Sequence, residues 1–431
     1  LFIPKLLPIL MITLYFKQAW QMIGQNRLVS ALSIAGTALS VAAVMLIVLI
    51  YQVNYGSYAP ETHRYRMLYV SGMSAHAKTL NGGLNNGRMS LHVLRECFYT
   101  LKTPQAVTGV FTDRQFIQLP GQKLSQQYRI SYTDAAFWTV FDFHFVAGAP
   151  FTSADLQAKA KRIVISASTA RKLFGTTDAA GRLLRINSVD YRVSGVVTDV
   201  SRSANSAYAD AWMPYIASEE LMTGTQLFEN TVGPLSAYLL ARSSDDFPAI
   251  RQELKGKLAR FNSELTETRI NFVHGPYTQW DRITGANDFQ EANLQQWLLS
   301  TGGLVLFLLL LPAFNIIGIT LTQFRKRRGE IGIRKSFGAH FSTLITQVLA
   351  ENLLISFLGG IIGLFLSYVL LYGCRSILFN AAPDFSMEML FQPLTFACAF
   401  VFTLLMNLLS AGWPAYKAAR LPVVKALNDI E

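Results

Sequence analysis

Four long apolar stretches constrain the fold of this chain more than any other feature of its sequence. They cover Leu28–Tyr51, Ala292–Phe324, Leu344–Cys374 and Met389–Tyr416, and Glu351 is the one acidic or basic residue within them. Each can cross a bilayer as a helix, the conformation that bonds every backbone amide internally in lipid. Only 15% of the residues are charged, whereas about 25% is usual in soluble domains. The chain is therefore expected to be an integral membrane protein, which excludes an ordinary soluble enzyme and a disordered chain.

The distribution of basic residues predicts how these spans are oriented. Lys17 and Arg27 precede the first span, a run from Arg325 to Arg328 follows the second, and Lys417 follows the fourth. Because Lys and Arg accumulate in short cytoplasmic loops, both termini and the basic loop are expected in the cytoplasm. The long polar segment between the first two spans then faces outward. The net charge of +11 is explained by this topology, and no nucleic-acid partner is expected.

The polar insert reads as a mixed α+β domain. Strands are predicted at Arg162–Ser166, Leu183–Ile186 and Tyr191–Val197, helices at Thr169–Phe174 and Pro248–Phe261, and a Gly/Asn loop at Asn81–Gly87. The fold class is therefore an α-helical membrane protein with four transmembrane helices and a large α+β domain inserted between the first and second. At Met11–Arg27, apolar residues recur at three- and four-residue steps, which favours an amphipathic helix on the inner leaflet; a soluble helix packing on a partner is the alternative.

Motifs of enzymatic chemistry are absent from the sequence. It contains no GxxxxGK[ST] phosphate loop and no HExxH, GxSxG or CxxC pattern. Its six histidines are scattered, and Cys97, Cys374 and Cys398 provide no disulfide framework. The chain is therefore not expected to be an enzyme, and neither a catalytic site nor a metal site is predicted.

The segment that follows the second span differs from an ordinary run of basic residues. Phe324–His340 reads FRKRRGEIGIRKSFGAH, in which apolar and charged residues alternate after a basic run. An ordinary positive-inside loop explains the basic residues but leaves Glu330, Ile331 and Ile333 unexplained. A short element with an apolar face and a charged rim is suited to docking in a cleft on a cytoplasmic partner.

The same segment resembles a known family signature. EIGIRKSFGA is similar to the EIGIRKALGA motif of the MacB/FtsX-like family of ABC transporter permeases, from which Ser336 and Phe337 are a mild departure. Other segments resemble that family's periplasmic core domain or its closing motif, in the same order along nearly the whole chain. They are Phe137–Phe151, Ile163–Gly175, Gly181–Asn187, Tyr191–Asp199, Tyr208–Pro214 and, at the end, Pro414–Leu427.

The resemblance implies a permease that works as a homodimer, or as a heterodimer with a related permease, beside a separate cytoplasmic ATPase. That ATPase would bind ATP and Mg²⁺, and this chain would hold no cofactor. The residues implied to contact it are Arg328, Glu330, Ile331, Gly332, Ile333, Arg334, Lys335 and Gly338. The implied mechanism is mechanotransmission, in which ATP-driven closure moves the outer domain and no substrate crosses the permease itself.

The resemblance leaves the transported substrate open. Export of a drug, toxin or peptide, with a periplasmic adaptor and an outer-membrane duct as further partners, is the leading version. Lipoprotein release is the first alternative, and regulation of a periplasmic partner is the second. A bacterial inner membrane is the implied location.

Small residues in two spans predict close helix packing. They are Gly36, Ser40, Gly359, Gly360, Gly363 and Ser367. Whether they meet within one subunit or across a dimer stays open. Pro312 is expected to kink the second span, either to transmit motion or as a passive feature of shape. Glu351 is expected at the inner interface rather than in a conduit.

The expected domain boundaries follow from these readings. They are 1–27 for the amphipathic helix, 28–51 for the first span, 52–296 for the periplasmic core domain, 297–324 for the second span, 325–343 for the coupling loop, 344–374 for the third span, 375–388 for a short periplasmic loop, 389–416 for the fourth span and 417–431 for the cytoplasmic tail.

Overall fold

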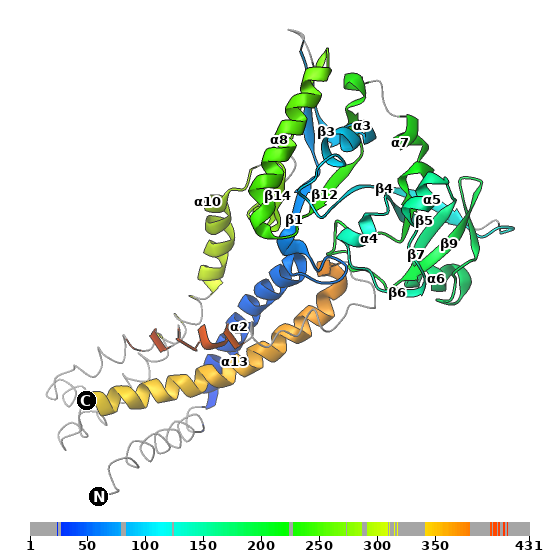
Figure 1. The fold of residues 1–431 in the computed structure, drawn as a ribbon. Coiled ribbons are helices and arrows are strands. Elements are labelled where there is room, and N and C mark those ends of the chain that lie inside the picture. The colour runs from blue at the N-terminus through cyan, green and yellow to red at the C-terminus, as the bar shows by residue number, and fades with distance from the viewer. Residues whose placement is uncertain are drawn as a thin grey trace, which may run out of the picture. The chain divides into compact units, whose positions relative to one another are not determined.

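Figure 1 shows the computed structural model, which describes most of the polar insert and two of the long apolar helices. The described residues are 24, 27–78, 83–122, 125–223, 227–272, 274–286, 291–308, 341–379 and single helical positions within 310–317 and 397–412. By internal contacts the chain divides into two units. We call Leu1–Val53, Leu298–Leu378 and Ser386–Glu431 the helical unit, and Asn54–Trp297 with Phe379–Phe385 the α+β unit.

The helical unit contains two helices that are long and apolar enough to cross a membrane. They are α2 (Arg27–Tyr55), with a candidate span at Ser30–Gln52, and α13 (Phe341–Phe379), with a candidate span at Asn352–Gly373. A shorter apolar helix at Leu294–Leu308 comprises α10 (Leu294–Trp297), the π-helical turn η6 (Leu298–Gly302) and the residues that follow. Most of the stretches 309–324 and 389–416 lies outside the described residues, so the count of four spans stays a prediction.

Close approach of α2 and α13 occurs at small residues within one chain. A Cβ atom placed on Gly359 would lie 2.8 Å from Cβ of Thr37, and one on Gly363 would lie 2.6 Å from the carbonyl oxygen of Ala38. A Cβ atom on Gly360 would collide with the ring of Phe400. These glycines therefore permit the backbones to approach to a distance that a larger residue would prevent.

The two serines predicted to support helix packing, Ser40 and Ser367, differ from these glycines. The Ser40 hydroxyl donates to the carbonyl oxygen of Gly36 (3.0 Å), and the Ser367 hydroxyl donates to that of Leu364 (2.7 Å). Both hydrogen bonds lie within the serine's own helix, so neither serine bridges the two helices through these bonds.

The α+β unit is built around a ten-stranded sheet. Its strands are β1 (Met67–Val70), β4 (Ala106–Gln118), β5 (Ser125–Thr133), β6 (Phe145–Gly148), β7 (Arg162–Ser166), β8 (Leu183–Ile186), β9 (Val189–Val197), β10 (Ala211–Pro214), β12 (Ser236–Leu240) and β14 (Tyr277–Thr278). Their order is β14-β1-β12-β4-β5-β10-β7-β9-β6, and β8 pairs with both β4 and β9. The pairs β10–β5 and β7–β9 are parallel, and the others are antiparallel.

Both faces of this sheet are buried over much of its area. In β10, Ala211 and Met213 belong to one hydrophobic cluster, whereas Trp212 belongs to the other. This follows from the two-residue period of a strand, which sends alternate side chains to opposite faces. The second cluster is rich in aromatic rings, with Phe137, Trp138 and Phe143 around Trp212.

A four-stranded sheet has the order β11-β3-β2-β13. Its strands are β2 (Met73–Ala77), β3 (Leu84–Met89), β11 (Val232–Gly233) and β13 (Thr268–Asn271). The long helix α8 (Phe247–Glu264) packs on β13, and its buried Ile250, Leu254 and Phe261 join the first hydrophobic cluster. Proline at the first turn of α8 is compatible with a helix start, because that amide has no partner in the helix.

The remaining described elements are short. They are η1 (Arg64–Arg66), α3 (Leu91–Val93), η2 (Leu94–Phe98), α4 (Phe137–Val140), α5 (Ser153–Gln157), α6 (Ala167–Phe174), η3 (Tyr215–Ala217), α7 (Glu219–Thr223), η4 (Leu227–Asn230), η5 (Ser244–Asp246) and α9 (Gln279–Ile283).

Helix α6 has a start signal and a stop signal in its own local sequence. The Ser166 hydroxyl accepts from the amide of Thr169 at its start, and Gly175, with φ of 72°, ends it.

The predicted strands and helices of the insert are confirmed, each to within a few residues of its end. The loop predicted at Asn81–Gly87 is wrong from Leu84 onward, because Leu84–Gly87 belongs to β3. There, Asn85 and Asn86 pair with β2 at Ala75 and Ser74. Residues of low strand propensity are tolerated because pairing with β2 and β11, rather than side-chain preference, holds this strand. Asn81 and Gly82 lie outside the described residues.

Candidate functional site

The predicted coupling residues lie outside the described residues. This holds for all of Arg328, Glu330, Ile331, Gly332, Ile333, Arg334, Lys335 and Gly338, and also for Pro312. The backbone of Glu351 lies in α13, but its side chain is not among those described. The docking role of this segment therefore stays a prediction.

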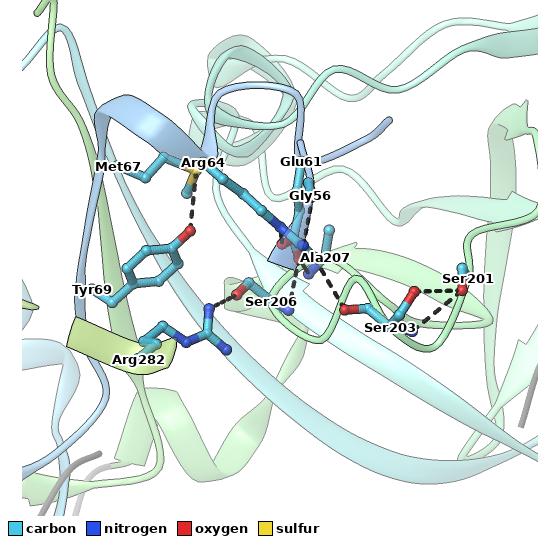
Figure 2. Close-up of polar contacts among 10 residues, drawn as sticks. All are labelled: Gly56, Glu61, Arg64, Met67, Tyr69, Ser201, Ser203, Ser206, Ala207 and Arg282. Atoms are coloured by element: carbon cyan, nitrogen blue, oxygen red, sulfur yellow. Dashed lines mark hydrogen bonds and ion pairs between the residues drawn. The ribbon is translucent and has the colours of Figure 1, made fainter. Parts of the chain in front are cut away.

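Among the described residues, buried charge gathers where the chain leaves α2. The carboxylate of Glu61 and the guanidinium of Arg64 form an ion pair with an Nε–Oε2 distance of 2.6 Å, and their side chains are only 1% and 5% exposed. Figure 2 shows that Arg64 has two further partners besides Glu61. Its two terminal nitrogens donate to the carbonyl oxygens of Gly56 (2.7 Å) and Ser203 (3.1 Å). Gly56 is the first residue after α2, so Arg64 binds the chain directly after that helix.

Glu61 connects the same point to a distant loop. Its Oε1 atom accepts hydrogen bonds from the amides of Ser206 (2.9 Å) and Ala207 (3.2 Å). The carbonyl oxygen of Ala207 in turn accepts from the indole Nε1 of Trp212 (3.1 Å), which is fully buried in β10. The segment that follows α2 is thereby joined to the large sheet through polar contacts as well as apolar packing.

Arg282 of α9 approaches the same loop from the other end of the insert. Its guanidinium carbon lies 4.6 Å from the centre of the Tyr69 ring in β1, a cation–π distance, and its Nη1 donates to the hydroxyl of Ser206 (3.5 Å; Figure 2). Burial raises the pKa of Tyr69 well above its usual range, and the nearby carboxylate of Glu61 adds to the rise. The phenol therefore stays neutral, and its hydroxyl contacts the sulfur of Met67 (3.9 Å).

We call this set the junction and define it as Gly56, Glu61, Arg64, Tyr69, Ser203, Ser206, Ala207 and Arg282. It brings together the segment after α2, the loop 201–207 and helix α9, which precedes the apolar helix at Leu294–Leu308. Both ends of the α+β unit that continue into apolar helices thus meet one loop. Removing one partner of a buried ion pair typically costs 3–5 kcal/mol, because the other charge is left without compensation.

The junction offers no arrangement for catalysis. No nucleophile beside a base occurs in it, and no group of three metal-ligating side chains is found in the described part of the chain. The contacts of the junction are hydrogen bonds, an ion pair and a cation–π contact, which hold the segment after α2 and helix α9 against the loop 201–207. The sequence did not single out these residues. Glu61 and Arg64 have helical i,i+3 spacing after an apolar stretch, but nothing in that pattern shows that both are buried.

A second buried carboxylate supports structure elsewhere in the α+β unit. Asp134 accepts hydrogen bonds from the hydroxyls of Tyr99 and Thr108 and from the amides of Gly109 and Phe137. Burial raises the pKa of Asp134, and these four donors oppose that rise. Asp134 follows β5 and thereby links the end of that strand to β4 and to the start of α4.

Comparison with known families identifies both halves of the chain. Residues 30–257 match the MacB-like periplasmic core domain, and residues 302–423 match the FtsX-like permease C-terminal region. The chain belongs to the MacB/FtsX-like ABC transporter permeases. The predicted resemblance is confirmed, together with the α+β domain that precedes the permease region.

Relatives of this permease include named exporters. The pyoverdine export ATP-binding/permease protein PvdT of Pseudomonas savastanoi pv. phaseolicola is 27% identical over 423 residues, which cover 95% of this chain and 58% of that protein. PvdT of Pseudomonas aeruginosa is 24% identical over 424 residues, with the same coverage. The permease described here thus spans less than two thirds of the length of these relatives. The periplasmic region of MacB from Actinobacillus actinomycetemcomitans aligns with 47% of the chain and 89% of its own length, at 14% identity and a TM-score of 0.32.

Proposed function

We propose that this permease couples ATP hydrolysis by a partner ATPase to movements of its α+β unit, and that these movements drive export of a small molecule or peptide. The junction is the observation that carries this proposal. It joins the chain directly after α2 to the loop 201–207 through buried contacts of Arg64 and Glu61. In this proposal, a displacement of α2 along its axis would pull on the loop 201–207 through Gly56 and Arg64.

Two features favour mechanical transmission over a polar conduit. Neither candidate span, Ser30–Gln52 or Asn352–Gly373, contains a charged residue, whereas membrane pathways for polar solutes are usually lined by ionisable groups. The close contact of α2 with α13 at Gly359 and Gly363 also leaves no room for a solute between these helices at that level.

In this proposal the ATPase is a separate cytoplasmic subunit that binds ATP and Mg²⁺ and contacts Phe324–His340. The permease would act as a dimer, with itself or with a related permease, in a bacterial inner membrane with both termini cytoplasmic. A periplasmic adaptor and an outer-membrane duct would complete the route.

Export is favoured over the alternatives because the relatives are named as pyoverdine export proteins. Lipoprotein release is the second candidate, and regulation of a periplasmic partner is the third. A pyoverdine-like molecule is accordingly the first substrate to test.

The test measures ATP hydrolysis and export separately. The permease is purified in mild detergent with its copurifying proteins, which are identified by mass spectrometry and reconstituted into liposomes. The Arg64→Met variant should keep the ATPase bound and hydrolysing ATP but lose most export, whereas Arg260→Ala should keep both activities. Arg260 is the matched control, because its ion pair with Glu264 is exposed. Full export by Arg64→Met, or absence of any ATPase after crosslinking at Phe324–His340, would refute the proposal.

A further inference from the structure

Helix α9 has two sides with different partners. Successive residues of a helix are turned by about 100°, so Trp280 and Arg282 point to nearly opposite sides. Arg282 faces Tyr69 in the junction, whereas the Trp280 side chain is 57% exposed. The acidic residue of α9, Asp281, accepts from the amide (2.8 Å) and hydroxyl (2.9 Å) of Thr278 in a capping box. The exposed side of α9 is thus dominated by an indole ring.

Trp280 is paired with a second tryptophan at the start of an apolar helix. The ring centres of Trp280 and Trp297 are 6.2 Å apart, with an interplanar angle of 59°. Trp297 belongs to the apolar helix Leu294–Leu308, in which the next two residues, Leu298 and Leu299, are 52% and 72% exposed. The indole pair is therefore continuous with a surface of exposed leucines.

A hydrogen bond places this part of the helix beside the end of a candidate span. The hydroxyls of Tyr51 and Thr301 are 2.8 Å apart, and Tyr51 is the last residue but one of the candidate span Ser30–Gln52. Trp297 precedes Thr301 by four residues, or about 6 Å along a helix axis. A residue that far beyond the hydrocarbon edge lies at the depth of the lipid headgroups.

We propose that Trp280 and Trp297 together anchor α9 in the headgroup layer of the bilayer, so that the α+β unit contacts lipid directly beside the junction. An indole suits this layer because it combines a large apolar ring with one N–H donor, and tryptophan is enriched at both membrane interfaces. The partner is the phospholipid surface rather than a protein, since the exposed ring continues into the exposed leucines of an apolar helix whose Thr301 is hydrogen-bonded to the end of a candidate span.

This anchor gives the junction a fixed reference. Arg282 holds one side of α9 to Tyr69, while Trp280 holds the other side at the membrane surface. The inference rests on membership of a membrane permease family and needs neither the ATPase nor export.

The test measures depth in lipid on the full chain. Cys374 and Cys398 are replaced by alanine, the buried Cys97 is kept, and an environment-sensitive fluorophore is attached at Trp280→Cys in phosphatidylcholine nanodiscs. The matched control is Phe116→Cys in β4, because Phe116 is also an aromatic residue of the α+β unit and is 56% exposed. Headgroup spin-labelled lipid should quench the label at position 280 at least about twofold more than at position 116. Equal quenching at both positions, or a blue-shifted but unquenched label at 280, would overturn the proposal.

A second measurement avoids the label and any disturbance that it causes in α9. Brominated phosphatidylcholine quenches tryptophans that contact lipid, so Trp280→Phe should lower the quenched part of the intrinsic fluorescence. The control is Trp138→Phe, which removes a partly buried ring that packs against Phe137, Phe143 and Trp212 of the α+β unit. An unchanged quenched fraction in Trp280→Phe would exclude the lipid contact. Neither measurement uses ATP, so its failure is distinct from failure of the coupling mechanism.

Discussion

Replacing Arg64 by methionine is the sharpest test of the junction. The substitution keeps the apolar stem but removes the ion pair with Glu61, whose side chain is 1% exposed, and the hydrogen bonds to Gly56 and Ser203. Glu61 would keep its two amide donors but lose its compensating charge. We expect the free energy of unfolding of the α+β unit to fall by about 3–5 kcal/mol, the range for breaking a buried pair. Net stabilities of about 5–15 kcal/mol are usual, so the variant should still fold, with a smaller margin.

The assay is urea unfolding of the purified permease, followed by tryptophan fluorescence. Trp212 is a suitable reporter because it is fully buried and donates to Ala207 within the junction. The double variant Glu61→Gln/Arg64→Met should recover at least about 1–2 kcal/mol, because the neutral amide oxygen still accepts from the loop and carries no buried charge. The exposed control Arg260→Ala should change stability by less than about 0.5 kcal/mol.

Two results would refute this reasoning. The first is an Arg64→Met variant no less stable than Arg260→Ala, which would mean that the buried pair is not formed. The second concerns the single variants Glu61→Gln and Arg64→Met. If the double variant loses as much unfolding free energy as the two single variants together, the two sites are independent rather than coupled.

Three further predictions concern other parts of the chain. Gly359→Ala should destabilise the helical unit by about 1–3 kcal/mol in thermal unfolding, because the new Cβ meets Thr37. The control Gly373→Ala places its Cβ in open space and should be neutral or stabilising. Equal effects of the two substitutions would argue against close packing at Gly359. Desolvation raises the pKa of Glu229, but hydrogen bonds from Thr266 and Thr268 outweigh it and lower that pKa to about 2 from its ordinary 4.5. Because this folded-state pKa is depressed, the stabilisation is present above about pH 4.5 and is lost as the pH falls toward 2. Glu229→Gln should therefore lower the free energy of unfolding by about 1 kcal/mol at pH 7, after discounting for solvent screening, and by almost nothing at pH 2. A loss that does not depend on pH would contradict this. Glu330→Lys should leave the permease inserted but uncouple ATP hydrolysis from export in liposomes, and full export by this variant would show that the docking assignment is wrong.

Local sequence was sufficient for elements whose signals are local. Helix α6 carries local signals, since Ser166 caps its start and Gly175 ends it, and β7 is a short β-branched run typical of a buried strand. Strand β3 was missed because its Asn and Gly residues carry turn signals, and the pairing that holds it comes from β2 and β11. Non-local pairing cannot be read from the propensities of one segment.

The junction was also invisible to sequence reasoning. Glu61 and Arg282 are separated by most of the insert, and both contact the loop at Ser206 only once the large sheet has formed. Before folding, each reads as an ordinary solvated charge. Similarly, the small residues of α13 indicated close packing but not the partner, and only the folded chain shows that Gly359 and Gly363 face α2 of the same subunit.

The sequence by itself determined the membrane character, the mixed α+β insert and the family, because uncharged stretches, strand periodicity and linear motifs are properties of contiguous residues. The tertiary structure decided which charges are buried, which glycines touch a neighbouring helix and which tryptophans stay exposed. Those properties depend on residues that are distant along the chain, and burial is what converts a common side chain such as Arg64 into one whose removal costs several kcal/mol.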